Sequence, residues 1–88
     1  MQAVEWTVDV SFQEDPDRTD AIVTLTLADG TALRAQGHAR RNPDDPARPR
    51  VGEEIAAARA MSDLVHQLME RAATEIEDVT HQPAHLSV

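Results

Sequence analysis

The arginines are the residues of this 88-residue chain whose type and spacing could carry chemistry. All eight cationic side chains are arginines, and five of them lie between positions 34 and 50, where only two carboxylates occur. Guanidinium groups bind phosphates and carboxylates through paired N–H donors. The stretch therefore predicts a contact surface for an anion, for RNA or for a protein partner, made of Arg34, His38, Arg40, Arg41, Arg48 and Arg50.

The charge of the whole chain favours a second interpretation of the same arginines. The net charge is −8, and a field of that sign repels phosphate at long range. Glu5 and Asp9 fall on the polar face of one predicted strand, and Arg34 and Arg40 fall on the polar face of another. Cross-strand ion pairs could therefore neutralise the arginines within the sheet. The sequence leaves both interpretations open.

The histidines predict no metal site and no catalytic site. His81 and His85 have the spacing of a helical zinc pair, but Pro83 lies between them and the chain has no cysteine. His66 falls on the solvent side of a predicted helix, with no nucleophile beside it. We expect no catalytic residue, no metal and no cofactor, so the chain is predicted not to be an enzyme.

Three segments have the alternating pattern of β-strands. Residues 5–12 alternate strictly and predict a half-buried strand, and residues 20–27 and 31–40 predict two more. An Asp29-Gly30 turn joins the last two as a hairpin and is expected to supply positive φ angles. The inward-facing residues are expected to be Trp6, Val8, Val10, Phe12, Ala21, Val23, Leu25, Leu27, Leu33, Ala35, Gly37 and Ala39.

The second half of the chain predicts a loop and two helices. Residues 41–52 contain three prolines and a glycine, which favour a long loop. Residues 53–72 predict an amphipathic helix with Glu53 and Glu54 in its first turn. A capping-box pattern at residues 74–77 predicts a short second helix over residues 75–80. The long helix is expected to bury Ala57, Ala58, Met61, Leu64, Val65, Leu68, Met69 and Ala72.

These elements predict an α+β fold of order β-β-β-α-α. A three-stranded antiparallel sheet is covered on one face by the long C-terminal helix, with the short second helix beside it. Residues 1–88 form a single domain with frayed ends at about residues 1–4 and 84–88. Two unpaired sheet edges and a modest core favour a homodimer. The chain contains no signal peptide pattern and no long apolar run, so we expect a cytoplasmic protein without a membrane partner.

Four blocks of sequence carry a family resemblance. They are WTVDV from Trp6, ARRNP from Ala39, VGEE from Val51 together with ARAMSDL from Ala58, and DVTHQPA from Asp78. In this order they resemble a family of small actinobacterial proteins of unknown function that is described as double-stranded-RNA-binding-domain-like. Its mycobacterial members belong to the hypoxia and dormancy response and are likened to ribosome hibernation promoting factors.

The resemblance implies a small, homodimeric, stress-linked protein that acts on the ribosome or a ribosomal protein. It transfers no binding residue, because the chain has no lysine to match those with which RNA-binding domains of this fold class contact phosphates. RNA contacts are therefore expected from the arginines, and DNA is not expected as a partner. The alternative is an acidic homodimeric protein-binding module that has no nucleic-acid role and attracts a basic partner.

Overall fold

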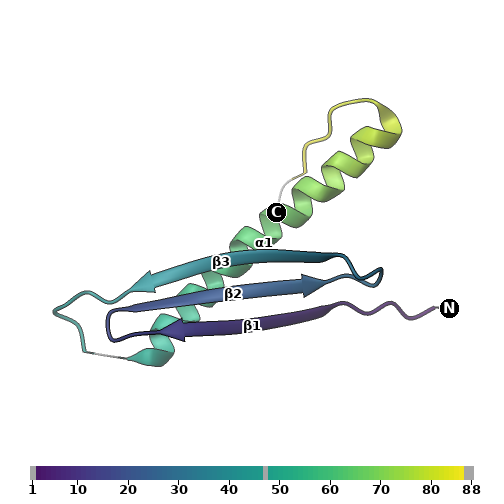
Figure 1. The fold of residues 1–88 in the computed structure, drawn as a ribbon. Coiled ribbons are helices and arrows are strands. Elements are labelled where there is room, and N and C mark those ends of the chain that lie inside the picture. The colour runs from purple at the N-terminus through teal and green to yellow at the C-terminus, as the bar shows by residue number, and fades with distance from the viewer. Residues whose placement is uncertain (1, 47, 87–88) are drawn as a thin grey trace.

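A computed structural model describes residues 2–46 and 48–86 of the chain. The described elements are three strands, β1 (Thr7–Glu14), β2 (Arg18–Thr26) and β3 (Ala32–Arg40), followed by one helix, α1 (Pro49–Thr80). The strands form an antiparallel sheet in the order β1-β2-β3, with α1 against one face (Figure 1). The α+β class, the antiparallel sheet and the long C-terminal helix are confirmed. The predicted frayed ends fall partly on Met1, Ser87 and Val88, which lie outside the described residues.

The core lies between α1 and the two strands β2 and β3. Alternate residues of β2 and β3 point towards α1, as their sequence pattern predicts, because successive side chains of a strand point to opposite faces. From the helix, every fourth residue reaches the same interface. The buried apolar residues are Ala21, Val23, Leu25, Ala35, Ala39, Ala56, Ala60 and Leu64.

Gly37 sets how closely α1 approaches the sheet. A Cβ atom built on Gly37 would lie 2.5 Å from the carbonyl oxygen of Ala56 and 2.9 Å from the carbonyl carbon of Arg59. Both contacts are with helix backbone, which cannot rotate away as a side chain can. The helix therefore rests on β3 where the strand has no side chain, and the alanines beside this point fill the remaining space.

The β2–β3 hairpin closes through a single left-handed residue. Gly30 has φ +90° and its N–H donates to the Leu27 carbonyl at 3.0 Å. The prediction that Asp29 also adopts positive φ is wrong, because the loop has three residues and needs that conformation only at its last position. Asp29 instead accepts a hydrogen bond from the Thr31 N–H at 2.9 Å. This bond lowers the pKa of the Asp29 carboxyl.

The predicted division into two helices is wrong. One continuous helix runs over all 32 residues of α1, so the described chain has no second helix. The helix begins at Pro49, because proline suits the first helical position, where no intrahelical N–H bond is lost. Glu53 and Glu54 consequently lie in the second turn. The capping-box pattern at residues 74–77 is embedded in the helix, since no glycine or proline interrupts residues 53–80.

The helix crosses the sheet diagonally and covers only part of it (Figure 1). Its start lies beside β2, where Gly52 approaches Thr19, and further along it reaches the outer edge of β3. It then extends beyond the sheet (Figure 1). No helix of the described residues is long and apolar enough to cross a membrane.

The predicted burial of β1 is wrong. Its apolar row does share a face with the core, because Val8, Val10 and Phe12 are the register partners of Leu25, Val23 and Ala21. All eight residues of β1 are nevertheless exposed. A helix about 10 Å wide spans roughly two strands spaced about 4.8 Å apart. A single helix packed on β2 and β3 therefore leaves β1 uncovered.

The buried side of α1 is also displaced from the predicted stripe. The fully buried helix residues include Ala56 and Ala60, which the prediction omitted, whereas Met61 is 43% exposed. Val65 and Leu68 are half-buried. The helix has turned its smallest residues towards the sheet, because they allow the close approach at Gly37.

Candidate functional site

The structure places the six predicted contact residues on β3, in the loop after it and at the start of α1, and three of them, Arg40, Arg41 and Arg48, line one pocket. Arg34, His38 and Arg40 lie on the open face of β3, opposite to α1, because the intervening residues of this strand face the helix. They form a row about 20 Å long, at about 3.3 Å per residue. We call these three residues the β3 row. It presents cationic and imidazole groups on the flat side of the sheet that no helix covers.

The Arg41 side chain is held in place by hydrogen bonds and an ion pair. Its Nε donates to the Pro16 carbonyl at 3.2 Å and its Nη1 to the Asp45 carbonyl at 2.5 Å. Its Nη2 lies 3.3 Å from Oδ1 of Asp17. The Arg41 side chain thus joins the loop after β3 to the β1–β2 turn. Because these acceptors occupy the guanidinium, it contributes little to an outer binding surface.

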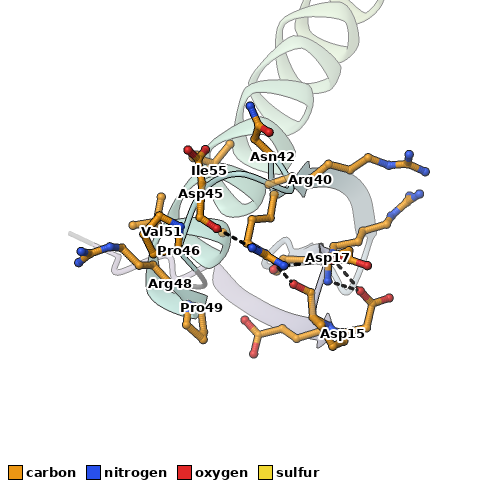
Figure 2. A pocket seen from close by; sticks show the side chains of 17 residues that line it. Asp15, Asp17, Arg40, Asn42, Asp45, Pro46, Arg48, Pro49, Val51 and Ile55 are labelled. Atoms are coloured by element: carbon orange, nitrogen blue, oxygen red, sulfur yellow. Dashed lines mark hydrogen bonds and ion pairs between the residues drawn. The ribbon is translucent and has the colours of Figure 1, made fainter.

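Arg48 and Arg50 lie at the start of α1. Arg48 is the N-cap residue, and Arg50 is in the first turn. Figure 2 shows the side chains of Arg40 and Arg48 extending away from each other on opposite sides of a pocket. The predicted contact residues thus fall into the β3 row, the half-buried Arg41 and the two arginines at the helix start.

The predicted neutralisation of the arginines within the sheet is not observed. Among the described residues the ion pairs are Arg18 with Asp20, Arg41 with Asp17, and Arg71 with Glu75. None of these pairs uses Glu5 or Asp9, and none uses Arg34 or Arg40. Among the described residues, Arg34 and Arg40 are thus outside ion pairs, and Asp20 is the register partner of His38.

A pocket of about 620 Å³ lies where three segments meet at the start of α1 (Figure 2). The β1–β2 turn, the loop after β3 and the first turns of the helix all line it, and Val51 and Ile55 provide apolar surface. Its charged lining includes the arginines at positions 40 and 48 but also Glu14, Asp15 and Asp45. Because both signs are present in similar number, the pocket does not select an anion or a cation.

The helix start also brings two carboxylates together. Partial desolvation, the charge of Glu53 and a hydrogen bond with Glu53 raise the pKa of Glu14. Such a group binds its proton more tightly in the folded than in the unfolded chain. It favours folding below the ordinary pKa of a glutamate, and this contribution is lost as the pH rises through the raised pKa.

We therefore expect Glu14→Gln to increase the melting temperature slightly at pH 7, because it removes the repulsion from Glu53. The increase should disappear at a pH well below the ordinary pKa of glutamate, where both carboxyls are protonated. Thermal unfolding of the two proteins across this pH range measures the effect. An increase of equal size at both ends of the range would contradict the assigned cause.

The sequence did not predict an exposed row of apolar side chains along β1 and the residue before it. Trp6, Val8, Val10 and Phe12 are 53%, 52%, 36% and 38% exposed. We call these four residues the β1 strip. Met61 on α1 is also exposed, at 43%. The signal that could have found the strip was the number of strands, since three strands are too wide for one helix.

A second apolar surface lies where α1 extends past the sheet. Ile76 and Val79 are 41% and 80% exposed. We call residues 76–80 the helix overhang. Just before the overhang, Thr74 and Glu75 line a shallow hollow together with Leu33 of β3. The overhang is an amphipathic helix end without a sheet to cover.

The histidines are dispersed in the structure. Nδ1 of His66 lies 2.8 Å from the carbonyl oxygen of Ser62 one turn earlier, and His81 ends α1 with φ 57°. In the described residues no three histidine, aspartate or glutamate side chains are grouped as metal ligands would be.

Comparison with known proteins places this arrangement in a family. The sequence model described as Rv2632c-like matches residues 4–85, which include all three strands and α1. The chain belongs to the Rv2632c-like family. It is 42% identical over 81 residues to the uncharacterized protein MT1780 of Mycobacterium tuberculosis strain CDC 1551, covering 92% of this chain and 85% of that protein.

Two further comparisons concern Rv2632c, the protein from which the family takes its description. The uncharacterized protein Rv2632c of Mycobacterium tuberculosis strain H37Rv is 41% identical over 76 residues, covering 86% of this chain and 81% of that protein. The crystal structure of Rv2632c aligns with a TM-score of 0.82 and 37% identity, over 94% of this chain and 98% of that chain. The Rv2632c-like fold is therefore one sheet and one long helix, as described here.

Proposed function

We propose that this Rv2632c-like protein is a non-catalytic binding protein of the cytoplasm that acts as a homodimer. The observation that carries the proposal is the β1 strip, an exposed apolar row on the face of the sheet that also forms the core. Exposed apolar surface is removed from water when another molecule packs on it, at about 25 cal/mol per Å². The dispersed histidines support a binding role over a catalytic one.

A second copy of the chain fits the exposed surfaces. The β1 strip is a sheet face that lacks a helix, and the helix overhang is a helix end that lacks a sheet. Two copies related by a two-fold axis can place each overhang on the strip of the other, so that every contact forms twice. This arrangement supplies the second helix that a three-stranded sheet requires.

We further propose that the dimer contacts the ribosome as a stress- or dormancy-associated factor. The resemblance to double-stranded-RNA-binding-domain-like proteins and the open β3 row support RNA as the target. Arginines outside ion pairs can bind phosphates through charge-assisted hydrogen bonds. The total charge of −8 opposes RNA at long range, so the contact is expected only where the β3 row reaches the phosphates directly.

Ribosome co-sedimentation tests this part of the proposal. Arg34→Glu with Arg40→Glu should weaken ribosome association by at least tenfold, because two phosphate contacts become repulsions. The slope of log affinity against log salt should fall by about 2. Arg48→Glu with Arg50→Glu is the matched control, since it changes the charge equally at the helix start. Equal losses in both variants, or no co-sedimentation of the unmodified protein, would contradict a contact through the β3 row.

The second candidate is an acidic homodimeric protein-binding module without a nucleic-acid role. It is favoured by the charge of the first 17 residues, which hold five carboxylates and no lysine or arginine. Such a region attracts a basic protein. In that case the two arginine variants should bind their partner as the unmodified protein does, whereas neutralising the acidic residues should weaken binding.

A further inference from the structure

The two outer edges of the sheet differ in how they are covered. On β3, Nη1 of Arg59 donates to the His38 carbonyl at 2.8 Å, and Nε2 of Gln67 donates to the Arg34 carbonyl at 2.9 Å. Both donors belong to α1, which therefore occupies acceptors that another strand would need. The β3 edge is less available for strand addition than a bare edge, because two of its carbonyl acceptors are already used.

The outer edge of β1 has none of the usual features that prevent strand addition. The strand pairs with β2 without interruption from Thr7 to Glu14, so no bulge twists it away. It contains no proline, lysine or arginine, and all of its residues are exposed. In the described part of the chain, no side chain of α1 donates a hydrogen bond to this edge as Arg59 does to β3. Alternate backbone groups of β1 are thus available to a fourth strand.

The side chains of β1 specify what that fourth strand should contain. Residues directly opposite in a strand pair share a face and interact. On one face the added strand would meet Val8, Val10 and Phe12, so its residues there should be apolar. On the other face it would meet Asp9, with the carboxylate of Glu5 on the same side just before the strand, whereas Glu14 shares the apolar face at the far end. Residues on that face should be basic.

We propose that the outer edge of β1 is the docking strand for an extended segment of a basic partner protein, in which apolar residues alternate with lysine or arginine. Main-chain hydrogen bonds would provide affinity, and the alternating side chains would provide selectivity. The inference rests on the protein-binding role and adds its location, its mode and the chemistry of the partner.

A second copy suits this edge less well than a basic segment does. Pairing β1 with β1 of another copy would bring together two strands that each carry Asp9 and Glu14 and no lysine or arginine. Like charges in adjacent strands are destabilising. The proposed dimer uses the face of β1 and the helix overhang, so it leaves the edge free.

Binding of synthetic peptides to the full chain tests the docking strand. The probe is a short peptide of alternating lysine and valine, and the matched control replaces each lysine by glutamate. Trp6 is the only tryptophan and lies next to β1, so its fluorescence reports binding. Amide hydrogen exchange measured by NMR reports the mode. A docked strand should protect every second amide of β1, because only alternate N–H groups point outwards.

Charge reversal on β1 separates this docking from general attraction to an acidic protein. Asp9→Arg should weaken binding of the lysine peptide roughly tenfold at low salt, because it replaces a cross-strand attraction with a repulsion. Glu54→Arg is the matched control, since this exposed residue lies on α1. It should change the affinity little. A third peptide with N-methyl groups on alternate residues should bind much more weakly, because it cannot pair with an edge.

The outcomes distinguish the docking mode from the protein-binding role. If the lysine peptide binds but no alternate protection appears on β1, the docking strand is wrong although a basic partner still fits. The same holds if Asp9→Arg and Glu54→Arg lose affinity equally. If neither the lysine peptide nor basic proteins bind, the docking strand and the protein-binding role both fail. Protection of β1 at high protein concentration without any peptide would show that a second copy occupies the edge, which also overturns the inference.

Discussion

Replacing Gly37 by alanine is expected to lower the free energy of unfolding by about 2–4 kcal/mol. The added methyl group would lie 2.5 Å from the Ala56 carbonyl oxygen, a contact with helix backbone. To relieve it, α1 must move away from β3, and the movement opens space around Ala60 and Leu64. For a domain of this size, the change corresponds to a fall of about 10–25 °C in melting temperature.

Gly52→Ala is the matched control for this prediction. A Cβ atom at Gly52 would lie 2.7 Å from Oγ1 of Thr19, which is a side-chain atom that can rotate. Alanine also stabilises a helical position relative to glycine by up to about 1 kcal/mol. The two effects oppose each other, so little change is expected. Thermal and urea unfolding of both variants measure the difference, and similar losses would show that Gly37 does not set the helix position.

Replacing Val8 by aspartate is expected to raise the dissociation constant of the homodimer more than a hundredfold. Val8 is 52% exposed in the single chain and lies in the β1 strip, which the proposed dimer buries. An unpaired carboxylate in an apolar interface is costly, and the two-fold axis makes the cost occur twice. The fold of each copy should persist, because this side chain is not part of the core.

Sedimentation velocity at micromolar protein concentration measures the dimer, and circular dichroism reports the fold. Val51→Asp is the matched control, because Val51 is similarly exposed, at 48%, but lies at the start of α1 and is not part of the β1 strip. The control should remain dimeric. A single sedimenting monomer for the unmodified chain would overturn the dimer, and a dimer that tolerates aspartate at position 8 would place the interface elsewhere.

The sheet was predicted well where one face is covered and less well where it is not. The alternation in residues 20–27 and 31–40 gave the correct inward faces, and the register of β1 confirms that its apolar row faces the same side. Alternation reports which residues share a face. It does not report whether another element covers that face, so the exposure of Trp6 and Val8 could not be predicted from it.

The helix was likewise predicted only in part from local sequence patterns. Its existence followed from a long segment without glycine or proline, and its end at Thr80 agrees with the predicted end of the second helix. The capping-box pattern predicted a break that does not occur. Thr74 and Glu77 are compatible with a helix interior as well as a helix start. With helix formers on both sides, continuing the helix costs less than interrupting it.

The sequence alone determined the class of fold, the faces of the strands and the types of residue that could bind an anion, because these depend on local periodicity and composition. Only the tertiary structure decided how those residues are grouped. It tied Arg41 to the β1–β2 turn, placed Arg48 at the helix start and left the β3 row open. It also left β1 without a covering helix. These outcomes depend on the diagonal path of α1, which is fixed by long-range packing of the helix backbone against Gly37.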